Sequence, residues 1–102
     1  MLWYTAKCRF LSLHSGEEPP HEMLGEFRFF LLKAEDEEVA REKARLIAKQ
    51  REHSYKNQYG ATVTWVFDSL IDVKQILNSE LGEGAEIYSE YFSAAQNSVI
   101  EF

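Results

Sequence analysis

The chain has 102 residues, of which 45% are hydrophobic and 14% aromatic, and this suits one folded domain rather than two domains or a disordered chain. Its net charge of −6 repels nucleic acid, whose binding depends on neutralising phosphates, so we expect no nucleic-acid partner. The single cysteine, Cys8, excludes an internal disulfide, and its place in an apolar strand pattern indicates a small buried side chain rather than a nucleophile.

No segment of the sequence has the pattern of a secretion signal or a membrane span. Polar residues follow Met1–Tyr4 directly, and the longest apolar runs, at 29–32 and 63–67, are far too short to cross a bilayer. We therefore expect a cytoplasmic protein with no membrane partner.

Alternating hydrophobicity predicts two β-strands in the first third of the chain. Between Tyr4 and Phe10 every second residue is apolar, which indicates a strand with one buried face. The stretch from Ser15 to Gly25 holds both prolines and predicts a flexible loop. Residues 26–34 are apolar on both strand faces, as is typical of a central strand that is covered on both sides.

A single helix is predicted to begin near Asp36, a residue type favoured at helix N-caps. Acidic residues follow in the first turn and basic residues occur near Arg51, which complements the helix dipole at both ends. Small apolar residues share one face and allow close approach to a sheet: Ala40, Ala44, Ile47 and Ala48. We expect the helix to fray within residues 53–57 and the connection to end at Gly60.

Two further strands are predicted after the helix. Residues 62–76 form a long alternating segment, and its length favours a bend or bulge near Asp68 and Ser69. Residues 78–84 contain two glycines and predict a hairpin connection to a last strand over 85–93. We interpret residues 94–102 as a C-terminal tail.

These elements predict an α+β fold of order β-β-α-β-β, with one helix on one face of a mainly antiparallel four-stranded sheet. The second sheet face then has no helix to cover it, although either Phe29 and Leu31 or Phe30 and Leu32 must point there. Such a surface usually marks an interface, so we predict a homodimer through this face, with the tail at 99–102 as the competing cover.

The densest polar and aromatic stretch lies at 53–60, and it predicts the one candidate site. If the last hairpin adjoins the strand that bears Trp65, the site comprises His53, Tyr55, Asn57, Trp65, Glu86 and Tyr88. These groups offer hydrogen-bond donors and acceptors for a small polar ligand or for the side chains of a protein partner. The alternative is that they cap the helix and satisfy one another. A small enzyme that uses His53 with a nearby carboxylate is the competing function, although no spaced nucleophile and base accompany it.

Other patterns of reactive residues favour ordinary roles. His14 and His21 flank the acidic proline-containing loop, but their spacing fits no standard metal site, so we predict no metal and no cofactor. The carboxylate pairs 68/72 and 86/90 lie at strand spacing, where solvent-facing charges that discourage aggregation are common.

Five short motifs together resemble a known family. They are W-Y-x-A-K from Trp3, A-E-D-E-E-x-A from Ala34, H-S-Y-x-N from His53, T-V-x-W-x-F from Thr62 with I-D-V from Ile71, and G-x-E-I-Y-S from Gly84. In these the chain resembles the bacterial family called "domain of unknown function 4288", over roughly residues 3–92. The resemblance implies a small bacterial cytoplasmic domain without an established activity, and it assigns no catalytic residues.

Overall fold

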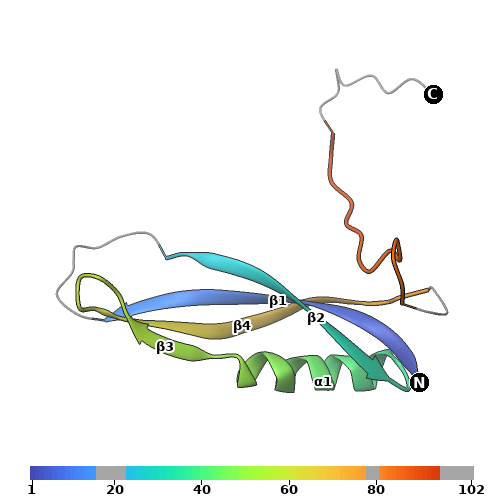
Figure 1. Ribbon diagram of the computed structural model, residues 1–102, viewed down its shortest axis with the longest axis horizontal. Helices are drawn as coiled ribbons and strands as arrows, with labels where there is room; N and C mark the ends of the chain where they lie inside the picture. Colours follow the sequence, from blue (N-terminus) through green and yellow to red (C-terminus); the bar gives the residue numbers. More distant parts are fainter. Residues whose placement is uncertain (16–22, 78–80, 95–102) are drawn as a thin grey trace.

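The computed structural model describes residues 1–15, 23–77 and 81–94, and it consists of one sheet and one helix. Four antiparallel strands form the sheet: β1 (Leu2–Ser15), β2 (Gly25–Ala34), β3 (His53–Lys56) and β4 (Thr62–Gln75). Their order across the sheet is β2-β1-β4-β3, and the helix α1 (Glu37–Gln50) lies along one face (Figure 1). The predicted α+β fold with the order β-β-α-β-β is confirmed.

The helix begins and packs as the sequence predicts. Asp36 is its N-cap, and the carboxylate of Asp36 accepts a hydrogen bond from the backbone N–H of Val39 at 2.9 Å. The three helix alanines of the predicted stripe are completely buried, and Ile47 packs against the same core. Because an alanine side chain is one methyl group, the helix backbone can lie close to the strands.

The core lies between the helix and the sheet. It is formed by alternate residues of β1, from Tyr4 to Phe10, together with residues of β2, β4 and α1. Phe10 is fully buried, and its ring meets Phe30 edge-on at 6.4 Å and Phe67 at 5.8 Å between centroids. The guanidinium of Arg28 lies 4.1 Å from the Phe10 ring centroid and covers this end of the core.

Two bulges bend β4, and the one at Asp68 lies where the sequence predicts an irregularity. Opposite Arg9 and Phe10, β4 supplies Ser69 and Phe67, so that Asp68 is an extra residue. A second register shift, between Lys7 and Cys8, leaves Ile71 unpaired in the same way. The bulges increase the local twist, which curls the sheet around the helix.

Two predictions about strand positions are wrong. Residues 85–94 form no strand; the fourth strand is instead β3, which follows the helix at once and pairs with residues 62–65 of β4. Residues 53–56 are therefore strand rather than a frayed helix end, because the helix already ends at Gln50 with Arg51 as its C-cap. Residues 85–93 contact one face of the sheet as irregular chain and do not pair along its edge.

The position of β2 also differs from the prediction, because β2 is an edge strand and not a central one. Phe30 packs against the helix side, whereas Phe27, Phe29 and Leu31 lie on the opposite side and stay about half exposed. The apolar residues on the second face of β2 thus form an exposed surface rather than a second part of the core. The loop at 16–22 and the tail at 95–102 lie outside the described residues.

Candidate interaction site

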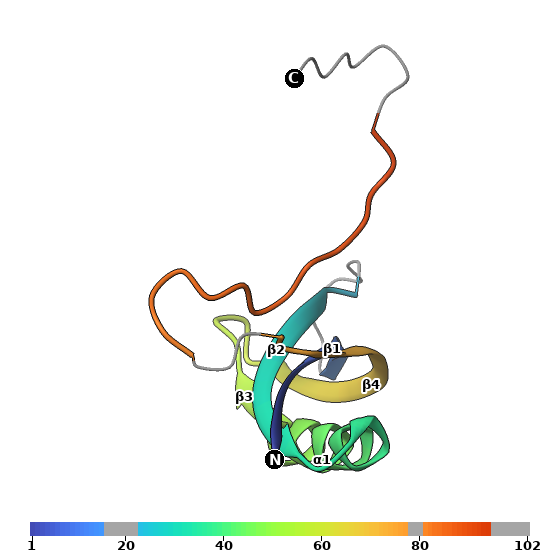
Figure 2. The ribbon, with the colours of Figure 1, turned by 90° about the vertical axis from the view of Figure 1, so that its right-hand side faces the viewer.

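We call the sheet face away from α1 the outer face. Alternate residues of three strands form its described centre: Thr5, Lys7 and Arg9 of β1, Phe27, Phe29 and Leu31 of β2, and Asp72 and Lys74 of β4. Residues 85–94, which we call the arm, cross this face as irregular chain and then lead away from it (Figure 2). The register of β1 with both neighbours thus sets Lys7 between Phe29 and Asp72.

Lys7 is the centre of the contact between the sheet and the arm. Its ammonium forms an ion pair with Glu90 and lies 4.4 Å from the ring centroid of Phe27 and 5.9 Å from that of Phe29. Only 13% of the Lys7 side chain is exposed, against 49% of the Glu90 side chain. The shielding of the cation by two aromatic rings and a carboxylate strengthens these electrostatic contacts relative to a fully solvated pair.

Tyr88 joins the arm to β4 and β2. Its hydroxyl donates a hydrogen bond to the Asp72 carboxylate at 3.2 Å, and its ring meets Phe29 edge-on at 5.0 Å between centroids. Partial burial, the charge and hydrogen bond of Asp72 and the charge of Glu90 together raise the pKa of Tyr88 to about 12. Tyr88 is therefore a proton donor to Asp72 at neutral pH.

Backbone carbonyls of the arm provide the remaining contacts. The ammonium of Lys74 donates to the Ser89 carbonyl at 2.6 Å, and the hydroxyl of Thr5 donates to the Ile87 carbonyl. Thr5 is only 3% exposed, although it points away from the core. Because carbonyls are the acceptors, these contacts fix the path of the arm without depending on its side chains.

An open pocket of about 460 Å³ lies between the end of β4 and the arm. Its lining consists of Lys74, Gln75, Leu77 and the four arm residues 86–89. Glu86 and Tyr88 of the predicted site therefore border one pocket, which Lys74 also lines, and the Lys74 ammonium lies 5.2 Å from the Tyr88 ring centroid. Recognition of a small polar ligand stays a prediction.

The other four residues of the predicted site lie elsewhere, on the β3–β4 hairpin. His53 and Tyr55 are neighbours on β3, and Trp65 is the β4 partner of His53. Trp65 and Asp72 are seven positions apart on β4, which is roughly 20 Å along a strand. The structure thus brings Glu86 and Tyr88 together and separates them from His53.

His53 and Asn57 make local contacts, within the β3–β4 hairpin and with the residue that caps the helix. Nδ1 of His53 donates to the Arg51 carbonyl at 3.2 Å, and its ring stacks on exposed Tyr55 with 6.0 Å between centroids. The Asn57 side-chain oxygen accepts from the backbone N–H groups of Tyr59 and Ala61, which closes the turn. A general base for the competing enzymatic function is not supported by this geometry, because His53 lies on an open strand edge.

Trp65 belongs to the core rather than to a ligand site. It packs partly buried against the core cluster, with the Arg28 guanidinium 5.6 Å from its ring centroid. The buried thiol of Cys8 is likewise structural: burial raises its pKa to about 11, against a smaller opposing influence of Arg45. Within the described residues, no three His, Cys, Asp or Glu side chains are grouped so that they could hold a metal ion.

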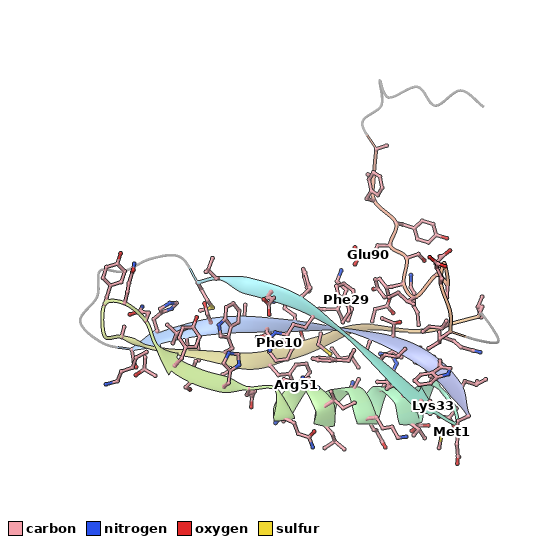
Figure 3. The ribbon with its side chains drawn as sticks, in the orientation of Figure 1. Met1, Phe10, Phe29, Lys33, Arg51 and Glu90 are labelled. Atoms are coloured by element: carbon pink, nitrogen blue, oxygen red, sulfur yellow. The ribbon has the colours of Figure 1, made fainter. Side chains whose placement is uncertain are left out.

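The outer face also carries exposed apolar side chains. Phe27, Phe29 and Leu31, which we call the β2 row, are 52%, 47% and 51% exposed. Beyond Glu90 the arm continues with Tyr91 and Phe92, which are 100% and 88% exposed and which we call the tip. The side-chain view in Figure 3 places Glu90 and Phe29 on the side away from α1, with Arg51 on the helix side.

Sequence reasoning missed Thr5, Lys7 and Lys74 as partners of the arm. Their outward strand positions resemble ordinary solvent-facing sites, and the sequence does not indicate that residues more than eighty positions later cover two of them. The available signal was the W-Y-x-A-K motif at the start of the chain, together with the I-Y-S-E stretch of the arm.

Comparison with known proteins yields one relationship. No curated protein and no solved structure is significantly similar to this chain. Among its described helices, none is long and apolar enough to cross a membrane. A family model matches residues 3–89, which include β1 to β4 and the arm as far as Ser89. The chain therefore belongs to the family described as a domain of unknown function, DUF4288.

Proposed function

We propose that the chain is an interaction domain that forms a homodimer through its outer face. The observation that carries this proposal is the β2 row, where three large apolar side chains stand side by side at about half exposure on an edge strand. Contiguous exposed apolar surface of this kind marks binding sites for other proteins. The helix side offers no such row, because its alanine stripe is completely buried.

Charge and composition favour a protein partner over other macromolecules. The chain has a net charge of −6, which disfavours binding to nucleic acid and to anionic lipid surfaces. The lysines on the outer face have acceptors within the same chain, since Lys7 pairs with Glu90 and Lys74 binds the Ser89 carbonyl. Apolar side chains are thus the main contacts that the centre of this face offers, with Arg9 and Lys33 at the ends of the β2 row.

The experiment is a measurement of molar mass by light scattering and sedimentation at micromolar concentration. We expect twice the chain mass of 11.9 kDa. The double variant Phe27→Ser/Leu31→Ser should shift the equilibrium toward monomer, because it removes apolar area from the interface. It leaves Phe29 and its contact with Tyr88 in place.

The matched control is Leu46→Ser, which removes an equally apolar side chain, 65% exposed, from the helix. It should leave the mass unchanged. Circular dichroism would show that all variants keep their fold, since the row side chains are only half buried. A wild-type chain that is monomeric across the micromolar range would refute the proposal.

A further inference from the structure

We infer that the tip of one copy, Tyr91 and Phe92, packs on the β2 row of a second copy. This inference rests on the proposed homodimer and specifies its contact. It concerns two apolar groups on the same side of the sheet: among the described residues, the β2 row is about half exposed and the tip is almost fully exposed. The arm, held on its own sheet, then acts as a platform that presents the tip to the partner.

The anchoring of the arm brings the tip to the row. Glu90 pairs with Lys7, and the Lys7 ammonium lies over the rings of Phe27 and Phe29, so the arm crosses the sheet directly beside the row. The next residue, Tyr91, is nonetheless 100% exposed. Figures 1 and 2 show why, because the chain turns away from the sheet here and projects on the side opposite α1.

If a two-fold axis relates the two copies, the tip and the row of each copy are both buried in the dimer. The row and the tip are different patches, and a two-fold rotation that places the tip of one copy on the row of the other also places the second tip on the first row. The contact is thus made twice and the assembly closes as a dimer. A filament is not expected, because both patches are used within the pair.

The area is sufficient for a stable pair. Tyr91 and Phe92 are almost fully exposed, and a large aromatic side chain buries 150–250 Å². Together with the exposed halves of the row, the apolar side chains of one copy offer roughly 600–700 Å², close to the ~800 Å² per partner of a standard interface.

The charges beside the two patches are complementary. Lys33 lies two residues beyond Leu31 on β2, at one end of the row, and Arg9 lies opposite Phe27 at the other end, where it also pairs with Asp68 at 3.1 Å. The arm carries Glu86 and Glu90, of which Glu90 pairs with Lys7 of its own chain. A tip that reaches the partner's row therefore brings acidic chain toward basic side chains, which offsets the repulsion between two copies of net charge −6.

The test is disulfide trapping between two differently tagged full-length chains. One chain carries Phe92→Cys, and the other carries Phe27→Cys or Leu31→Cys, at opposite ends of the row. The native thiol does not compete, because Cys8 is completely buried. Oxidation catalysed by copper(II)-phenanthroline should give a mixed disulfide in at least one of the two mixtures, since a disulfide requires Cα atoms less than about 7 Å apart.

Three controls make the result decisive. A mixture of Phe92→Cys with Leu46→Cys, at an exposed helix position, should give no mixed disulfide. The double variant Tyr91→Ser/Phe92→Ser should weaken dimerisation at least tenfold in sedimentation, whereas Leu46→Ser should not. A single chain with both Phe92→Cys and Leu31→Cys should link between copies rather than within a monomer.

The outcomes separate this inference from the proposed function. A dimer that gives no disulfide between tip and row would overturn the inference and leave the homodimer standing. A disulfide formed within a monomeric chain would overturn it as well, because the tip would then cover its own row. A chain that never dimerises would overturn both.

Discussion

Lys7 shows how an outward-pointing polar residue becomes shielded without joining the core. The alternation of β1 correctly places it on the face opposite Ala6 and Cys8, and from sequence such a lysine is expected to be solvated. Its side chain is 13% exposed because Glu90 and two phenylalanine rings surround the ammonium. Strand periodicity predicts the face of a residue, but it carries no information about what a distant segment places on that face.

The raised pKa of Tyr88 predicts how the stability of the fold depends on pH. Because its pKa rises from 10.0 to about 12 in the folded chain, the native state holds this proton more tightly than the unfolded chain does. The resulting stabilisation is complete below pH 10 and is lost as the pH rises through about 12. The tyrosinate absorbance of wild type minus that of Tyr88→Phe should therefore show one group titrating near pH 12.

The neighbouring carboxylate provides the control for this titration. Asp72→Asn removes a negative charge and an acceptor of the Tyr88 hydroxyl, so the midpoint should move back toward 10.0. Burial, the larger cause, remains in this variant and should keep the midpoint above that value. A difference titration centred on 10.0 in the wild type would contradict the contact between arm and sheet.

At the scale of elements, the helix could be predicted and the short strand could not. The helix is specified locally, by Asp36 as cap and by alanines at 3.6-residue spacing, and the structure confirms both. In contrast, β3 consists of four exposed residues, His53 to Lys56, without an apolar alternation. Its existence depends on pairing with β4, which is a tertiary contact.

The alanine stripe predicts a strong effect of enlarging one helix residue. Ala44 is completely buried between the helix and the strands, so Ala44→Leu should lower the free energy of unfolding by about 1–3 kcal/mol through overpacking. Urea denaturation followed by circular dichroism measures this change. Leu46→Ala, at a position 65% exposed, should change stability by less than about 0.5 kcal/mol. Equal effects at both positions would mean that the helix does not approach the sheet closely.

At the scale of the whole molecule, the two sides of the sheet have different roles. The helix side is covered by small side chains and forms the core, whereas on the outer side the arm is the one described segment that crosses the sheet. Sequence reasoning predicted an uncovered face, yet it assigned the arm to the fourth strand of the sheet. It therefore joined Glu86 and Tyr88 to His53. The fold instead places His53 beside Trp65, toward the opposite end of β4 from Asp72, the partner of Tyr88.

Among the contacts that hold the arm, the ion pair between Lys7 and Glu90 can be tested by reversal of charge. Glu90→Lys places two ammonium groups together, and Lys7→Glu places two carboxylates together, so either change should detach the arm from the outer face. The combined variant Lys7→Glu/Glu90→Lys restores opposite charges and should restore attachment. A partly shielded pair is worth on the order of 1 kcal/mol, so each single change should raise the detached fraction about fivefold.

Cleavage by chymotrypsin after Tyr88 measures this detachment, because the Tyr88 ring is packed against Phe29 while the arm is attached. The rate should rise about fivefold in each single variant and return toward the wild-type rate in the combined one. Glu83→Lys makes the same change of charge at an exposed position before the arm, and it should leave the rate unchanged. Raised salt should accelerate wild-type cleavage, since it screens the pair. If the combined variant is cut as fast as the single ones, the ion pair does not hold the arm.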